Sequence, residues 1–180
     1  MPTPITGHIF IATSLDGFIA RPDGTLDWLI SRDAPDEDHG YPAFIARMDC
    51  IVMGRGTFEA VQTFPEWPYT IPVLVLSATL AGQPIPDALR GKVTFANHSP
   101  QQAMQSLAAK GHRRAYIDGG QIVQSFLRAG LIADMTITTA PVLIGQGRPL
   151  FGALPQDIPL IHTGTTTFPS GLVQSTWRVA

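Results

Sequence analysis

Ile51-Val-Met-Gly-Arg-Gly-Thr-Phe58 and Tyr116-Ile-Asp-Gly-Gly-Gln-Ile-Val123 are the two stretches that decide the fold. Each is an apolar run that breaks at glycine and resumes with helical spacing, which predicts a strand-to-helix turn. The first amide N–H groups of a helix have no partner within it, so they favour anions, as the helix dipole does. Either stretch alone is more typical of an ordinary turn in an α/β domain. Together, about 65 residues apart, they suit a dinucleotide.

Composition narrows the class of protein. The chain has 180 residues, which suits a single domain over residues 1–180 with its own core. Charged residues make up 14% of it, against about 25% in an average soluble domain, and apolar residues make up 44%. The surface therefore has few charges, and part of it is expected to form a pocket or a subunit contact. The net charge of −2 argues against nucleic acid as a partner.

The sequence also argues against membrane and metal sites. Its longest apolar runs are far shorter than a membrane span, and its N-terminus lacks the basic-then-apolar pattern of a signal peptide. The single cysteine, Cys50, cannot form an internal disulfide or a thiolate cage. It lies in an apolar run, where a small buried side chain is expected. We therefore expect a cytoplasmic protein with no metal.

Strand and helix patterns alternate along most of the chain. Strands are expected at residues 8–13, 50–53, 72–76, 93–96, 115–118 and 133–140. Helices are expected at residues 26–30, 41–48, 57–63, 100–110 and 121–129. Two alternating segments, 160–167 and 172–179, flank Pro169-Ser-Gly171 and predict an antiparallel hairpin. The pattern predicts an α/β fold with a mixed, mostly parallel sheet, helices on both faces and a C-terminal antiparallel hairpin.

The usual dinucleotide fingerprint is absent. Gly54-Arg-Gly56-Thr-Phe-Glu59 has glutamate where the third glycine belongs, and Gly145-Gln-Gly147 is followed by Arg148-Pro149. Binding of NADP would therefore require a different scaffold.

The ordered set of motifs resembles a specific fold. Ser14-Leu-Asp-Gly17, Met53-Gly-Arg-Gly-Thr57, Leu74-Val-Leu-Ser77 and Asp118-Gly-Gly120 resemble the three-layer dihydrofolate reductase fold. Pro141-Val-Leu-Ile-Gly-Gln-Gly-Arg-Pro-Leu-Phe151 is more similar to the C-terminal reductase domain of RibD-type riboflavin-biosynthesis enzymes. The resemblance implies a stand-alone, bacterial-type reductase that uses NADPH.

By this resemblance, the cofactor lies across the strand ends. The matching positions are Ala12, Ile19, Gly54, Arg55, Thr57, Ser77, Gly119, Gly120, Gln121 and Ile122. Arg55 would face the 2′-phosphate, with a hydroxyl from Ser77, and the turn after Asp118 would present N–H groups to the pyrophosphate. The residues agree, because no acid follows Ser77 until Asp87 that could repel a 2′-phosphate or bind a ribose diol. A solvated Arg55 is the alternative.

The resemblance places Ile11, Ala12, Ile19 and Ala20 beside the nicotinamide, although core packing also explains them, and it places Trp28 on the substrate. Reduction of an imine or carbonyl also needs a proton donor. The candidates are a water molecule or one of the carboxylates Asp27, Asp33, Asp36, Glu37 and Asp38. Asp33 is preferred, because it follows Trp28 at the spacing that the fold suggests. Asp16 is expected to be a turn residue. Asp118 either holds the glycine turn or touches a ligand.

One position departs from the RibD pattern. Those enzymes carry a lysine four positions before the Ser14 equivalent, tied to their substrate, whereas this chain has Phe10. The zinc-binding deaminase half is also missing. We therefore expect hydride transfer to a pyrimidine, pterin or related heterocycle, the nominal family activity being 5-amino-6-(5-phosphoribosylamino)uracil reduction. The alternatives are a dihydrofolate or pteridine reductase and a degenerate NADP-binding module without turnover. A homodimer is expected from the charge-poor surface and from the same resemblance.

Overall fold

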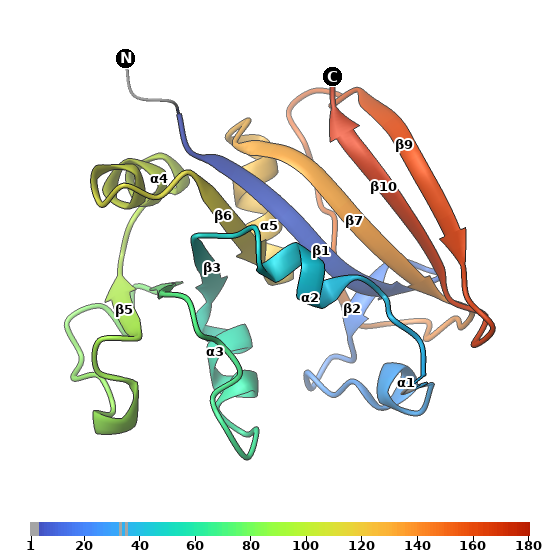
Figure 1. Cartoon of the computed structure of the whole chain (residues 1–180), viewed down its shortest axis with the longest axis horizontal. Helices are drawn as coiled ribbons and strands as arrows, with labels where there is room; N and C mark the ends of the chain where they lie inside the picture. Colours follow the sequence, from blue (N-terminus) through green and yellow to red (C-terminus); the bar gives the residue numbers. More distant parts are fainter. Residues whose placement is uncertain (1–3, 33, 35) are drawn as a thin grey trace.

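A computed structural model describes residues 4–32, 34 and 36–180. An eight-stranded sheet runs through the molecule in the order β5-β4-β3-β6-β1-β7-β10-β9 (Figure 1). Its strands are β1 (Thr6–Ser14), β3 (Cys50–Gly54), β4 (Val73–Leu76), β5 (Val93–Ala96), β6 (Arg114–Asp118), β7 (Ile132–Ala140), β9 (Leu160–Thr167) and β10 (Val173–Val179). The six strands from β5 to β7 are parallel, and β10 is antiparallel to both of its neighbours. The mixed sheet and its terminal hairpin confirm the predicted fold class.

Helices cover both faces of this sheet. They are α1 (Asp27–Ile30), α2 (Tyr41–Ile45), α3 (Arg55–Val61), α4 (Pro100–Ala109) and α5 (Gly120–Arg128). Phe44 of α2 and Phe58 of α3 belong to one buried cluster, whereas Met104 of α4 and Phe126 of α5 belong to another. In Figure 1, α2 crosses in front of β1 and α5 lies behind the sheet. Each face therefore has its own core.

Local signals explain several elements. The Ser99 hydroxyl accepts the Gln102 amide N–H at 3.2 Å, and the Gln102 side chain accepts the Ser99 N–H at 2.9 Å, so α4 begins at a capping box. Gly111 follows that helix with a φ of 91°, a left-handed conformation in which glycine commonly ends a helix. Cys50 is 0% exposed, and burial raises the pKa of its thiol to about 12. Cys50 is thus the small buried side chain that the sequence predicted.

The sheet topology places a switch point between β3 and β6. These strands are neighbours, with Met53 paired to Asp118. The chain leaves β3 through α3 toward β4 and leaves β6 through α5 toward β7, so the two connections diverge to opposite sides and opposite faces. In open α/β sheets, ligands bind at the carboxyl ends of the strands at such a switch point. Both glycine turns begin there.

Two short strands were not expected from the sequence. β2 (Phe18–Ala20) and β8 (Arg148–Pro149) pair in a separate antiparallel sheet.

The helix expected over residues 41–48 is shorter in the structure. α2 ends at Ile45, and hydrogen-bonded turns continue from there to Met48. Within the described residues, no helix is long and apolar enough to cross a membrane.

Candidate functional site

The two glycine turns touch each other. Gly119 has a φ of 92°, and a Cβ atom built on it would lie 2.6 Å from the Thr57 hydroxyl oxygen of α3. A Cβ atom on Gly120 would lie 2.6 Å from the carbonyl oxygen of Pro149. Both distances are too short for a real side chain, so only glycine fits at these positions. The close approach leaves backbone, rather than side chains, facing the start of α5.

Other residues of the predicted cofactor set gather at the same place. Ile122 of α5 lies 3.1 Å from the ideal Cβ position of Gly54, and Ile19 of β2 lies 3.2 Å from that of Gly120. Ala12 lies on β1, partly exposed, in register with Thr138 of β7. The structure therefore brings six of the ten predicted residues into one cluster: Ile19, Gly54, Thr57, Gly119, Gly120 and Ile122. Gln121 follows in the first turn of α5.

A polar group lies on the β4 side of this cluster. Arg55 donates from Nη1 to the Thr79 hydroxyl at 3.2 Å, and the hydroxyls of Thr79 and Ser77 are 3.0 Å apart. Arg55 also lies 3.5 Å from the Glu59 carboxylate, but both side chains are exposed, so this pair contributes little. One cation and two hydroxyls thus converge where β3 and β4 end. Thr79 was missed by sequence reasoning, although its position two residues after Ser77 was a usable signal.

Asp118 lies at the end of β6 in unusual surroundings for a carboxylate. It is partly exposed and accepts the Gly119 amide N–H at 2.9 Å. The phenols of Tyr41, Tyr69 and Tyr116 lie near it. Desolvation raises the pKa of Asp118 to about 6, although the hydrogen bond from the Gly119 amide acts in the opposite direction. Asp118 therefore stabilises the glycine turn, which is one of the two roles expected for it. It also carries a proton in mildly acidic solution.

Aromatic rings pack together near this carboxyl group. Phe10 packs on Tyr41 with ring centroids 5.7 Å apart and on Phe44 at 5.0 Å. The Tyr116 hydroxyl donates to the carbonyl oxygen of Phe10 at 3.0 Å. Burial raises the pKa of Tyr41 to about 12, and it raises those of the other two phenols too, so all three stay neutral. We call Phe10, Tyr41, Tyr69, Tyr116 and Asp118 the Asp118 cluster.

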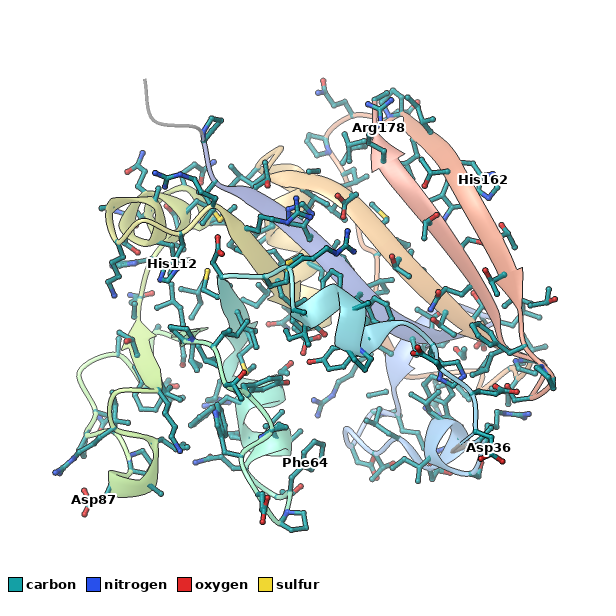
Figure 2. The ribbon with its side chains drawn as sticks, in the orientation of Figure 1. Asp36, Phe64, Asp87, His112, His162 and Arg178 are labelled. Carbon is teal, nitrogen blue, oxygen red and sulfur yellow. The ribbon has the colours of Figure 1, made fainter. Side chains whose placement is uncertain are left out.

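Several carboxylates proposed as proton donors have other partners. Asp27 binds Arg21 through both oxygens, at 2.6 and 2.9 Å. Asp38 accepts the amide N–H of Gly40 at 2.8 Å. Asp36 is exposed and lies at the periphery of the molecule (Figure 2). None of these three belongs to the Asp118 cluster.

Glu37 fastens its loop to the C-terminal hairpin. It accepts the amide N–H of Ser170 at 2.7 Å and the Ser170 hydroxyl at 2.6 Å, and it pairs with His39 at 3.0 Å. The same contacts hold the pKa of Glu37 below its usual range. Asp33, the preferred donor, lies outside the described residues, so its role stays a prediction.

Trp28 lies apart from the Asp118 cluster. Its side chain is only 4% exposed and belongs to a small core with Ala140 and Leu172, against which Phe168 packs. This core joins α1 to the hairpin. A role of Trp28 on the substrate therefore also stays a prediction.

Asp16 has the structural role expected of it. Its carboxylate accepts the Ser14 hydroxyl at 2.6 Å and the amide N–H groups of Ile144 and Gly145 at 3.2 and 2.8 Å. These bonds connect the Ser-Leu-Asp-Gly turn to the segment before β8. They explain how β2 and β8 are held together beside the start of α5.

No group of three or more potential metal ligands occurs in the described part of the chain. Two hollows, of about 210 and 260 Å³, lie against the C-terminal end of α5 and over β7 and β10. Neither is lined by a residue of the glycine turns or of the Asp118 cluster. The site is therefore defined by the strand ends, where both sets of residues meet.

Comparisons with known proteins show the family to which the chain belongs. The RibD C-terminal domain model matches residues 6–174. The uncharacterized protein YwjB of Bacillus subtilis is 33% identical over 163 residues, covering 89% of this chain and 90% of its own. The riboflavin biosynthesis protein RibD of Corynebacterium ammoniagenes is 26% identical over 149 residues, which cover 76% of this chain and 43% of that protein.

Solved structures show the same fold. A protein of Shewanella sp. PV-4, provisionally assigned to riboflavin biosynthesis, superposes with a TM-score of 0.91 at 39% identity, covering 98% of this chain and 99% of its own. Dihydrofolate reductase from Enterococcus faecalis, solved with NADP(H), superposes with a TM-score of 0.66 at 16% identity. The superposition covers 97% of this chain and 96% of that reductase. The fold is dihydrofolate reductase-like, and the chain belongs to the RibD C-terminal domain family.

Proposed function

We propose that this chain is an NADPH-dependent reductase that transfers a hydride to a pyrimidine, pterin or related heterocycle. It would act as a single-domain, cytoplasmic protein that forms a homodimer. The observation that carries the proposal is the order of groups along the carboxyl edge of the sheet. A positively charged side chain with two hydroxyl groups comes first. The turn at Gly119 and Gly120, which we call the glycine cradle, comes next, and apolar side chains follow it.

This order matches the order of groups in the cofactor. Arg55, Ser77 and Thr79 offer a cation and hydroxyls suited to a 2′-phosphate. Next to them, Gly119 and Gly120 leave the start of α5 open to backbone contact with a pyrophosphate. Beyond the cradle, Ile19 and Ala12 offer an apolar surface suited to a nicotinamide ring.

The Asp118 cluster suits a flat, uncharged substrate. Phe10 and the neutral phenols provide aromatic faces for stacking. Asp118 is the one acid among them, and it adjoins the glycine turn. Phe10 stands where RibD-type enzymes have a lysine, so the cluster lacks that cation. These features favour a heterocycle without a ribosyl phosphate over the nominal family substrate.

Reduction of a C=N or C=O bond adds a hydride to carbon and a proton to the heteroatom. NADPH, held by Arg55 and the glycine turn before α5, would supply the hydride. Asp118 is the described carboxyl that best fits the second task, because its raised pKa of about 6 keeps a proton on it in mildly acidic solution. The aromatic rings exclude water and hold the heterocycle beside this carboxyl group.

A substrate panel tests the proposal. The purified protein is mixed with NADPH and, in turn, with phosphoribosylaminouracil, dihydrofolate, a dihydropteridine and uncharged pyrimidines, and oxidation of NADPH is followed. We expect turnover of an uncharged heterocycle. Preferred turnover of phosphoribosylaminouracil would place the protein in riboflavin synthesis, and preferred turnover of dihydrofolate would make it a folate reductase. Tight NADPH binding without any turnover would indicate a degenerate binding module.

A further inference from the structure

Arg148 lies on β8, in the small sheet that lies beside the start of α5. In that sheet it pairs with Ala20, and Pro149 pairs with Phe18. The carbonyl oxygen of Pro149 lies 2.6 Å from the ideal Cβ position of Gly120. Arg148 therefore lies on a strand whose backbone touches the glycine cradle, although these two segments are far apart in the sequence.

The guanidinium group of Arg148 extends toward α3. Its Nη2 atom lies 3.1 Å from the ideal Cβ position of Gly24, and its Nη1 atom lies 3.5 Å from that of Gly56. Its Nε atom donates to the carbonyl oxygen of Pro22 at 3.4 Å. The side chain is exposed, and among the described residues no carboxylate forms an ion pair with it. The charge thus lies between the turn after β2 and the first turn of α3, without an anionic partner there.

This arrangement conflicts with ordinary helix electrostatics. The start of a helix favours acidic side chains, and α3 has none in its first turn. Arg55 occupies that turn instead, and Arg148 brings a second positive charge beside it. Sequences break local rules of this kind mostly at functional sites. Phosphate groups bound beside the two arginines would offset this unfavourable charge arrangement.

The two arginines have different surroundings. Arg55 contacts Thr79 on the β4 side of α3, whereas Arg148 lies beside Gly56 on the side of β2 and β8. A dinucleotide with its 2′-phosphate at Arg55 and its nicotinamide near Ile19 must pass Gly56 and the glycine cradle with its pyrophosphate. A guanidinium group commonly binds a phosphate through two parallel N–H···O hydrogen bonds.

We propose that Arg148 binds the pyrophosphate of the nicotinamide dinucleotide. The inference rests on the proposed function, and it deepens it by assigning a second cation to the same site. It also predicts different roles for the two arginines. Arg55 distinguishes NADPH from NADH, whereas Arg148 contributes equally to the binding of both.

Calorimetric titration with NADPH, NADH and 2′-AMP tests this assignment. Loss of one charge-assisted phosphate contact weakens binding roughly 10- to 150-fold. Arg148→Ala should therefore lower the affinities for NADPH and NADH by this factor while leaving that for 2′-AMP unchanged. Arg148→Lys should lose less. Arg128→Ala, at the other end of α5, is the matched control and should bind as the wild type does.

Three results would overturn the inference. Unchanged affinity of Arg148→Ala for both dinucleotides would remove Arg148 from the site while leaving the proposed function intact. A loss confined to NADPH and 2′-AMP would assign Arg148 to the 2′-phosphate instead. A wild-type protein that binds neither dinucleotide would refute the inference and the proposed function together. A melting temperature measured for each variant shows whether weaker binding reflects a loss of folding. If Arg148→Ala does not fold, the affinities of Arg148→Lys for the two dinucleotides test the inference instead.

Discussion

Replacing Asp118 by asparagine should make the protein more stable and less active. The pKa of Asp118 is raised from 3.8 to about 6, chiefly by desolvation. Each pKa unit corresponds to about 1.4 kcal/mol, so ionising this carboxyl in the folded protein costs about 3 kcal/mol at most. The folded state binds the proton more tightly than the unfolded state. Stability from this group is therefore full below pH 3.8 and is lost as the pH rises to about 6.

The amide of Asp118→Asn keeps an oxygen that can accept the Gly119 N–H but carries no charge. We expect the variant to unfold with a free energy about 1–2 kcal/mol higher than that of the wild type at pH 8, because no partly desolvated charge forms. At pH 3.5 the two proteins should be nearly equally stable. Turnover should fall about 10²- to 10⁴-fold if the carboxyl donates the proton, and the decline of the rate above pH 6 should disappear.

Guanidinium chloride unfolding at several pH values, with the pH–rate profile of each protein, measures both effects. Asp49→Asn is the matched control, because Asp49 accepts the amide N–H groups of Arg113 and Arg114, and these bonds lower its pKa. This control should lose stability above pH 4. If Asp118→Asn gained no stability at pH 8 and kept the wild-type pH–rate profile, the description of Asp118 as a desolvated proton donor would be refuted.

Three further outcomes are expected. Gly119→Ala should lower stability by about 1–3 kcal/mol, because Gly119 has a positive φ and its new Cβ would meet Thr57; a thermal melt checks this, and an unchanged melting temperature would contradict it. Phe10→Lys should raise the specificity constant for phosphoribosylaminouracil by about 10- to 150-fold, as measured by steady-state kinetics, and a wild-type constant of about 10⁴ M⁻¹s⁻¹ or more for this substrate would refute our substrate assignment. Sedimentation should show a homodimer at micromolar concentration, because the exposed edge of β9 and apolar side chains such as Leu160 and Val173 are available for pairing, whereas a 19.4 kDa particle would exclude it.

The elements that were predicted from sequence are those with strong local signals. β3, β6 and the hairpin strands each show an apolar run or an alternation bounded by glycine or proline. α4 has a cap at Ser99, proline at its first position and glycine beyond its end. In these segments the local preference and the final contacts agree, which is why position and type could both be predicted.

The small β2–β8 sheet could not be predicted in this way. Its strands have three and two residues, too few for any periodicity. They pair because Asp16 binds Ile144 and Gly145 across 128 and 129 positions of sequence. Arg148 depends on this pairing, and so its approach to Gly24 and Gly56 was not visible in the sequence.

The site was predicted unevenly for a related reason. Motifs identified the glycines, Arg55 and Ser77 as candidates, and the glycine positions could be predicted because backbone geometry requires glycine there. Asp118, the proton donor that we propose, could not be identified by motif, because a pKa depends on neighbours from distant segments. Desolvation near Tyr41, Tyr69 and Tyr116 raises the pKa of Asp118, whereas hydrogen bonds from Ser170 lower the pKa of Glu37.

Comparison of the affinities for NADPH and NADH tests the central claim most directly. The claim is that the chain binds NADPH at the switch point between β3 and β6, with Arg55, Ser77 and Thr79 on the 2′-phosphate. Isothermal titration should show NADPH binding at least about tenfold more tightly than NADH, and Arg55→Ala should narrow that gap while leaving NADH binding unchanged. Equal affinities for the two dinucleotides, or an unchanged preference in Arg55→Ala, would contradict the account.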